Sequence, residues 1–388
     1  MKVIPYGRQS ISESDIDAVR QVLNSDFLTQ GPAVPKFEEQ VADYCRAKYG
    51  TATSSATAGL HLACLALGVT AGDVVWTSPI TFVASANCAV YCGATVDFVD
   101  ISLKSYNMCP NALEEKLIRA ELAGKLPKAV IPVHLSGQSC DMERIHKLSE
   151  RYGFSIIEDA SHAIGARYLG EQVGCCRFSD ITVFSFHPVK IITTGEGGLA
   201  VTNDEVLDYK MKLLRSHGIT RDENRLEGHS EGPWYYQQLE LGFNYRMTDM
   251  QAALGSSQFK RLDEFIATRH KIADNYDTTL EDSAFILPHQ HEFSYSSYHL
   301  YIIRLKIGSN ILSHREVFEF LRNNGIGVNL HYIPVYHHPY YERLGFDRGY
   351  CKNAEVYYSQ AISIPMFPAL NSIDQKTVID CLLSIDNE

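Results

Sequence analysis

The sequence has no apolar run that approaches the roughly 20 residues needed by a membrane-spanning helix. Its start, Met1 to Ser10, lacks an apolar core flanked by positive charge, so we expect no signal peptide and a cytoplasmic protein. Positive charge is also scarce, because 35 Lys and Arg face 46 Asp and Glu, for a formal net charge of -11. This balance argues against a nucleic-acid-binding surface, although a local pocket can still bind an anion.

The sequence also lacks paired metal ligands. Its ten cysteines are irregularly spaced, and Cys88 with Cys92 has no second pair at zinc-ligand spacing. Among fifteen histidines, the densest pair is His337 and His338, in a Tyr- and Pro-rich segment without a carboxylate at ligand spacing. We therefore expect reduced, mostly buried thiols and assign no metal.

The chain of 388 residues is long enough for two domains, which we place at residues 1–250 and 251–388. In the first domain, short runs rich in β-branched residues alternate with helical patterns. We expect strands at residues 74–77, 96–99, 129–133, 155–158, 181–185 and 199–201, and helices at 56–67, 82–91, 111–120 and 142–152. This alternation predicts a mostly parallel sheet covered on both faces, with ligands at the carboxyl ends of its strands.

A helix at residues 247–276 could link this domain to a smaller α+β segment. There we expect a strand at 298–306, a helix at 313–323 and a strand at 327–330. Residues 220–240 are polar and end in Trp234-Tyr235-Tyr236, which indicates an exposed loop.

Three local features carry chemistry. Ser54-Ser55-Ala56-Thr57 precedes a helical pattern, where free N–H groups favour an anion such as phosphate, although an ordinary helix cap fits too. Asp159 ends a predicted strand and could pair with a protonated ring nitrogen or cap the next segment. Lys190 also follows a strand, and burial would make it nucleophilic enough for a Schiff base, although most lysines are ordinary surface residues. Together they fit pyridoxal phosphate (PLP), which needs all three groups.

Four separated motifs resemble those of the sugar aminotransferases of the DegT/DnrJ/EryC1/StrS family. The Ser-Phe-His-Pro-Val-Lys run at 185–190, with Glu-Gly-Gly at 196–198, resembles the lysine motif of that family. Glu-Asp-Ala-Ser-His at 158–162 and Gly-Phe-Asn-Tyr-Arg-Met at 242–247 resemble its acidic and Asn-Tyr-Arg motifs. Gly31-Pro32 with Phe37-Glu38 matches its N-terminal signature.

The resemblance implies the α/β fold of aspartate aminotransferase, which is fold type I of PLP enzymes. It has a mainly parallel seven-stranded sheet and a smaller C-terminal α+β domain, and a homodimer with sites at the interface is the active unit. By this resemblance Lys190 would form the Schiff base with PLP, and Asp159 would pair with its pyridinium nitrogen. His162 would contact the phenolic oxygen, and the ring of Phe82 would stack on the cofactor. Ala56, Thr57 and Ser185 would hold the phosphate, and Asn244 would reach the phosphate in the neighbouring subunit.

Residues 23–25, 28–31, 214–218, 234–236 and 331–334 look like those of family members that act in pseudaminic acid biosynthesis. This implies amino transfer from glutamate to C4 of a UDP-linked 2-acetamido-2,6-dideoxy-4-keto hexose. The implied sugar-nucleotide contacts are Tyr6, Asp26, Phe27, Leu28, Thr29, Ala56, Ser185, Asn244, His331, Tyr332, Ile333 and Pro334. One departure is Cys351-Lys352-Asn353-Ala354-Glu355, where many members have Cys-Pro-Val-Ala-Glu.

The cofactor motifs leave other substrates open, namely a C3-keto sugar or a sugar linked to GDP or dTDP. Family members with histidine in place of the lysine catalyse a dehydration, and Lys190 argues against that reaction. The alternative from a different class is a catalytically silent regulator that binds PLP. In such a protein, glutamate would not convert the bound cofactor to its amine form.

Overall fold

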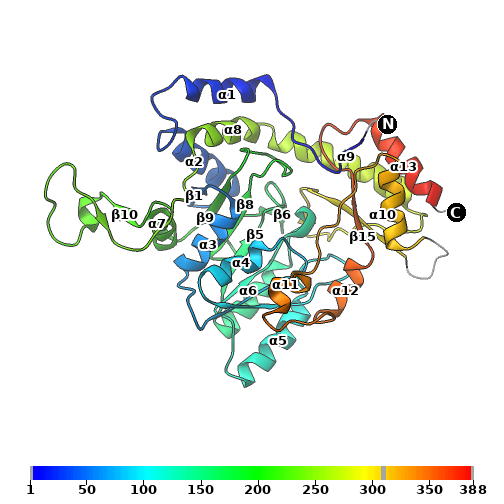
Figure 1. Ribbon diagram of the computed structural model, residues 1–388, viewed down its shortest axis with the longest axis horizontal. Helices are drawn as coiled ribbons and strands as arrows, with labels where there is room; N and C mark the ends of the chain where they lie inside the picture. Colours follow the sequence, from blue (N-terminus) through cyan, green and yellow to red (C-terminus); the bar gives the residue numbers. More distant parts are fainter. Residues whose placement is uncertain (1–2, 307–311, 386–388) are drawn as a thin grey trace.

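The computed structural model describes residues 3–306 and 312–385, and a seven-stranded sheet forms its centre (Figure 1). In spatial order the strands are β1 (Tyr49–Thr53), β9 (Gly198–Thr202), β8 (Ile181–Ser185), β5 (Ser155–Asp159), β4 (Ala129–Ile131), β2 (Val74–Thr77) and β3 (Thr95–Phe98). β9 pairs antiparallel with β1 and β8, and the other neighbouring strands pair in parallel. The mainly parallel seven-stranded sheet expected from the sequence is confirmed.

Helices cover both faces of this sheet. Successive side chains along a strand point to opposite faces, so neighbouring residues of one strand pack in different cores. Val183 of β8 packs in one core with residues of α3, α4 and α7, whereas its neighbour Phe184 packs in another core with residues of α2 and α8. Trp76 of β2 packs with residues of α5 and α6. The bounds are α2 (Ala33–Cys45), α3 (Ala56–Ala66), α4 (Ala84–Tyr91), α5 (Pro110–Leu122), α6 (Met142–Tyr152), α7 (Glu205–Leu214) and α8 (Asp249–Phe259).

The C-terminal part contains a second sheet and a core of its own. Its three strands are β12 (Phe285–Ile286), β14 (Tyr301–Leu305) and β15 (Ala361–Ile364), with β14 in the middle. The helices here are α9 (Leu262–Leu280), α10 (His314–Asn323), α11 (Pro339–Glu342), α12 (Lys352–Tyr358) and α13 (Ser372–Ile385). Ile4 from the N-terminal arm joins this core. The boundary of the two domains at residue 250 stays a prediction.

Smaller elements complete the described chain. They are α1 (Glu13–Leu23), which packs along α8, and the short strands β6 (Arg167–Tyr168), β7 (Glu171–Gln172), β10 (Ile219–Thr220), β11 (Gln237–Gln238) and β13 (Ser294–Tyr295). The segment between β10 and β11 projects from the body of the molecule at the left of Figure 1. Trp234 and Tyr236 lie on its exposed surface, so the expected exposed loop is confirmed.

The expected strands and helices between residues 50 and 205 lie within a few residues of their predicted bounds. Two later expectations were wrong. The single helix at 247–276 is two helices, α8 and α9, which are separated at Lys260 and Arg261. No continuous strand forms at 327–330. This segment makes only isolated bridges, in which Ile326 pairs with Ile4 of the N-terminal arm and Asn329 pairs with Ser363.

Two further observations concern the described residues. None of their helices is both long and apolar enough to cross a membrane. All ten cysteines are free thiols, and most of them are buried, as the sequence predicts.

Candidate active site

A cavity of about 790 Å³ opens at the carboxyl-terminal edge of the large sheet. Asp159 ends β5 and Ser185 ends β8, and both residues line it. Ligands of open α/β sheets bind at this edge, and the volume suits a small molecule. The predicted residues that line the cavity are Tyr6, Ala56, Thr57, Phe82, Asp159, His162, Ser185, Lys190, His331 and Tyr332.

One end of the cavity is the first turn of α3. Ser55 caps this helix, and its hydroxyl oxygen accepts a hydrogen bond from the N–H of Ala58 at 3.2 Å. The N–H groups of Ala56 and Thr57 have no acceptor within the helix, because they belong to its first turn. Together with the helix dipole, they make this turn suited to a phosphate group.

Gly198 lets β9 approach that turn closely. It pairs with Thr53 in the sheet, and a Cβ atom added to Gly198 would lie 2.5 Å from the backbone nitrogen of Ala56. No side chain fits at that distance, so any other residue must displace either β9 or the turn. The close approach keeps the first turn of α3 at the cavity wall.

Replacing Gly198 with alanine should therefore weaken PLP binding by about tenfold or more, which corresponds to the loss of roughly one hydrogen bond to a charged group. The measurement is the dissociation constant of PLP for the apoprotein, from an absorbance titration. Gly7→Ala is the matched control, because a Cβ at Gly7 meets no atom within 4 Å. An unchanged dissociation constant in the Gly198 variant would show that this turn does not hold the phosphate.

Asp159 lies buried in the cavity wall with defined partners for both carboxylate oxygens. The hydroxyl of Ser85 on α4 donates to Oδ2 at 2.6 Å, and the backbone N–H of Ser161 donates to Oδ1 at 3.1 Å. Ser85 in turn lies 2.7 Å from the hydroxyl of Thr81. These contacts fix the direction of the carboxylate, which could then pair with a protonated ring nitrogen.

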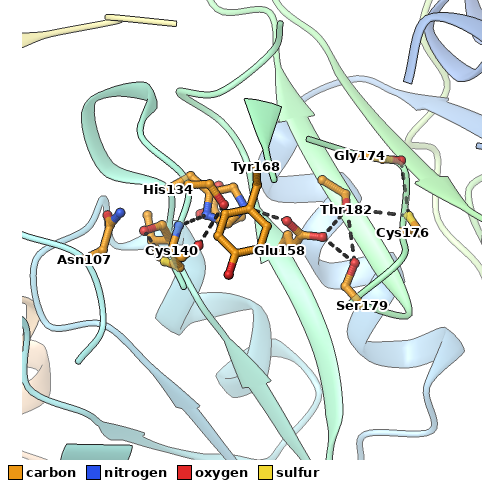
Figure 2. A network of polar contacts seen from close by, with 12 residues as sticks. Asn107, His134, Cys140, Glu158, Tyr168, Gly174, Cys176, Ser179 and Thr182 are labelled. Carbon is orange, nitrogen blue, oxygen red and sulfur yellow. Dashed lines mark hydrogen bonds and ion pairs between the residues drawn. The ribbon is translucent and has the colours of Figure 1, made fainter. Parts of the chain in front are cut away.

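A buried polar network supports the end of β5 from behind (Figure 2). His134 Nε2 lies 2.6 Å from the Glu158 carboxylate, which also accepts hydrogen bonds from the hydroxyls of Ser179 and Thr182. The backbone N–H of Cys140 donates to His134 Nδ1, so the ring proton is on Nε2 and is donated to Glu158. Burial by itself raises the pKa of Glu158, but its hydrogen bonds outweigh burial and lower it. None of these network residues lines the cavity.

Lys190 follows β8 in a tight turn, where its N–H donates to the carbonyl oxygen of His187 at 2.9 Å. Burial of the ammonium group lowers the pKa of Lys190 to about 8, although the nearby Asp159 carboxylate opposes this change. An appreciable minority of these side chains is therefore a neutral amine near physiological pH, far more than for a lysine with its usual pKa. That form can attack an aldehyde.

His162 lies between the cavity and the buried interior. The N–H of Ser136 donates to its Nδ1 at 3.3 Å, so the ring proton is on Nε2, which lies 3.1 Å from the hydroxyl of Tyr332. Burial, followed by the charges of Lys190 and His331, lowers the pKa of His162 well below its usual value. His162 is therefore a neutral hydrogen-bond donor at the cavity.

Aromatic rings form the opposite wall. Phe82 is 59% exposed, and its ring centroid lies 6.2 Å from that of Tyr332. Tyr6 from the N-terminal arm lies 5.3 Å from the His331 ring, whose Nδ1 is 2.8 Å from the hydroxyl of Ser363. An exposed ring at the cavity mouth is available to stack on a flat ligand.

Several predicted residues lie elsewhere on the described chain. Residues 26–29 connect α1 to α2 and lie beside α8, where the N–H of Asp249 bonds the carbonyl oxygen of Leu28 at 3.0 Å. Asn244 is exposed, next to Tyr245, whose carbonyl oxygen accepts the N–H of Ser54 at 2.7 Å. Neither these residues nor Ile333 and Pro334 line the cavity of their own chain. Their substrate and phosphate contacts stay predictions.

Ser85 and the His134 network are not among the residues predicted from the sequence. Ser85 lies three residues after Phe82 on a predicted helix, so helical spacing could have placed both near the same site. No comparable signal marks His134, because only the pairing of β4 with β5 brings it to Glu158.

Comparisons with known proteins identify the family of this chain. The model of the DegT/DnrJ/EryC1/StrS aminotransferase family matches residues 9–383. UDP-4-amino-4,6-dideoxy-N-acetyl-beta-L-altrosamine transaminase of Campylobacter jejuni is 40% identical, over 99% of this chain and 97% of the relative. Spore coat polysaccharide biosynthesis protein SpsC of Bacillus subtilis is 36% identical, over 98% and 97% of the two chains.

Solved structures of sugar aminotransferases also resemble this chain. Helicobacter pylori PseC, an aminotransferase in the biosynthesis of pseudoaminic acid, superimposes with a TM-score of 0.90 at 32% identity and full coverage of both chains. The PLP form of Spr1654 from Streptococcus pneumoniae has a TM-score of 0.89 at 28% identity, over 99% of each chain.

The fold is thus that of the fold type I PLP enzymes, and the cavity brings together a helix N-terminal turn, a carboxylate and a lysine, the kinds of group that PLP needs. This chain belongs to the DegT/DnrJ/EryC1/StrS family and is a PLP-dependent sugar aminotransferase.

Proposed function

We propose that this enzyme transfers the amino group of glutamate to C4 of a UDP-linked 2-acetamido-2,6-dideoxy-4-keto hexose, in pseudaminic acid biosynthesis. The observation that carries the chemistry is the position of Lys190, Asp159 and the first turn of α3 around one cavity. The sugar is supported by the similarity to the Campylobacter transaminase and to PseC. The products would be 2-oxoglutarate and the 4-amino sugar nucleotide.

Bound PLP supplies an aldehyde for the amine and a ring that accepts the electrons of a broken C–H bond. Lys190 would attach the cofactor and, once displaced by glutamate, would remove the Cα proton as a general base. In the second half-reaction the same amine would return a proton to C4 of the sugar. Asp159 would keep the ring nitrogen protonated, and His162 would donate Nε2–H to the phenolic oxygen. Phe82 would cover the exposed face of the ring.

The phosphate and the sugar nucleotide would draw residues from two subunits. Ala56, Thr57 and Ser185 would hold the phosphate within one chain, with Asn244 supplied by its partner in a homodimer. The exposed position of Asn244, away from the cavity of its own chain, is compatible with this role.

The sugar nucleotide would occupy the outer part of the cavity. Its contacts within the chain would be Tyr6, His331 and Tyr332, with Ile333 and Pro334 beside them. Asp26, Phe27, Leu28 and Thr29 would reach it from the partner subunit, since they lie outside the cavity of their own chain.

Two half-reactions can be observed separately in the absorption spectrum. We expect glutamate to remove the absorption band of the lysine-bound cofactor in the purified PLP-loaded enzyme, and the UDP-linked 4-keto sugar to restore it. Aspartate in place of glutamate, and dTDP- or GDP-linked keto sugars in place of the UDP sugar, are the controls.

The outcomes test the amino donor and the acceptor sugar separately. Loss of the band without recovery would reject this sugar while keeping glutamate as the donor. Recovery with a dTDP- or GDP-linked sugar, or with a C3-keto sugar, would replace the proposed acceptor. No response to glutamate would reject it as the donor.

A further inference from the structure

The ring of His299 packs against the ring of His162, with 4.3 Å between their centroids and 49° between their planes. His299 comes just before β14 in the C-terminal part of the chain, is 3% exposed and does not line the cavity. Its Nδ1 is buried and finds no hydrogen-bond partner among the described residues. This nitrogen does not hold the ring in place, so the contact with His162 is one of packing.

Hydrogen bonds join the backbone segments around the two rings. The hydroxyl of Ser297 donates to the carbonyl oxygen of His162 at 2.8 Å, and the N–H of Ser297 donates to the carbonyl oxygen of Gly137 at 3.1 Å. Ser136, in the same turn as Gly137, donates its N–H to Nδ1 of His162 at 3.3 Å. His162 is thus held between this turn and the segment that leads into β14.

Arg269 of α9 fixes the backbone of His299. Its side chain is 1% exposed, and Nη1 donates to the carbonyl oxygens of Tyr298 at 3.0 Å, His299 at 3.2 Å and Met366 at 3.0 Å. Burial lowers the pKa of Arg269 to about 9, which leaves the guanidinium charged near pH 7. Hydrogen bonds from a charged donor are stronger than those from a neutral one. The segment that carries His299 is therefore firmly anchored to α9.

Both histidine rings are neutral. Burial is the main cause that lowers the pKa of His162 and of His299 well below the usual value for histidine. The charges of Lys190 and His331 act in the same direction on both rings, and Arg269 adds to the effect on His299. Two neutral rings pack without electrostatic repulsion, so the close contact between them is a stable one.

We propose that His299 is a positioning residue for the cofactor, whose ring holds His162 in the orientation in which Nε2–H reaches the phenolic oxygen of PLP. The inference rests on the proposed contact of His162 with that oxygen. A side chain in a close-packed interior cannot turn while a neighbour fills the space beside it. Without the His299 ring, His162 would be free to tilt away from the cofactor. The C-terminal part of the chain would then control a cofactor contact made at the edge of the large sheet.

The titration of the lysine-bound cofactor reports this contact. The phenolic oxygen carries negative charge, and a hydrogen bond to it is worth most when the nearby Schiff-base nitrogen has lost its proton. A donor from His162 therefore lowers the pH at which this nitrogen loses its proton, and loss of the donor raises that pH. The absorption band of the lysine-bound cofactor changes with this titration.

The test measures the pH midpoint of that band in the PLP-loaded enzyme. We expect His299→Ala to raise the midpoint by about one pH unit, as when one hydrogen bond to a charged group is weakened. His299→Leu fills nearly the same volume and should restore the midpoint of the unchanged enzyme. His146→Ala, the matched control, removes a ring on α6 whose centroid lies 5.8 Å from that of Phe178, and it should leave the midpoint unchanged.

His299→Val guards against an alanine variant that does not fold. It leaves a smaller gap beside His162, so we expect a rise in the same direction but smaller than that of the alanine variant. No rise in either variant would overturn the proposal. Equal rises in the alanine and leucine variants, or the same rise in the His146 control, would also overturn it, because the effect would not follow the volume removed beside His162.

Changing His162 itself separates this inference from the cofactor contact on which it rests. His162→Leu should raise the midpoint at least as much as His299→Ala, and the double variant should show no further rise, because His299 acts through His162. An unchanged midpoint in His162→Leu would reject the contact with the phenolic oxygen, and the inference with it. A rise in His162→Leu without one in His299→Ala, or rises that add in the double variant, would reject only the role of His299.

Discussion

Lys190→Ala should abolish amino transfer, with turnover lower by at least about four orders of magnitude. The change removes both the group that attaches the cofactor and the base that moves the proton, and proton transfer alone contributes about 10²–10⁴-fold. The absorption band of the lysine-bound cofactor should disappear at the same time. Steady-state rates and the absorption spectrum of the PLP-incubated protein measure the two effects.

The fold should survive this change. Burial lowers the pKa of Lys190, which means that the folded protein disfavours its charged form, and the alanine variant avoids that cost. We therefore expect a melting temperature no lower than that of the unchanged apoprotein. Lys147→Ala is a matched control, because Lys147 is an exposed residue of α6 paired with Glu143 at 3.3 Å. Full activity in the Lys190 variant would remove this residue from the mechanism.

Asp159→Asn should lower kcat by about three orders of magnitude while PLP still binds. The amide keeps the shape of the side chain and can still bond Ser85 and the N–H of Ser161, but it carries no charge to hold a proton on the ring nitrogen. Loss of one preorganised electrostatic contact costs about 10²–10³-fold in comparable sites, and a full charge is lost here. Single-turnover rates with glutamate measure the effect on chemistry directly.

The Asp159→Asn variant also needs a control that removes a negative charge elsewhere in the protein. Asp380→Asn changes an exposed carboxylate of α13 that pairs with Lys376 at 3.0 Å, and it should leave kcat unchanged. Circular dichroism should show the same folded state for both variants. A nearly normal rate in Asp159→Asn would mean that Asp159 does not pair with the ring nitrogen.

The sequence predicted those parts of the fold and site in which local pattern and tertiary environment agree. β8 and β9 are buried along their whole length and consist largely of apolar residues, so their sequences identify them as interior strands. Asp159 and Lys190 could be located because each follows such a strand. β1 was not predicted, because its sequence Tyr-Gly-Thr-Ala-Thr lacks an apolar run.

Other features depend on partners that are distant in the sequence. Around residues 327–330 only isolated bridges form, between Ile326 and Ile4 and between Asn329 and Ser363, and no local pattern reports those pairings. The His134–Glu158 pair depends on the parallel pairing of β4 with β5. The placement of Asn244 and residues 26–29 outside their own cavity likewise follows from tertiary structure, which local motifs do not encode.

The antiparallel β9 has a consequence for the order of events during synthesis. The turn between β1 and α3 rests against Gly198 of β9 and on the carbonyl oxygen of Tyr245, and both are translated long after the turn itself. A ribosome-bound chain that ends before Gly198 contains the α3 sequence but neither of these supports. Such a chain should not capture the cofactor, because closing so long a loop must come first. Holoenzyme formation is therefore open only to a chain that extends beyond Tyr245, and not to its emerging N-terminal part.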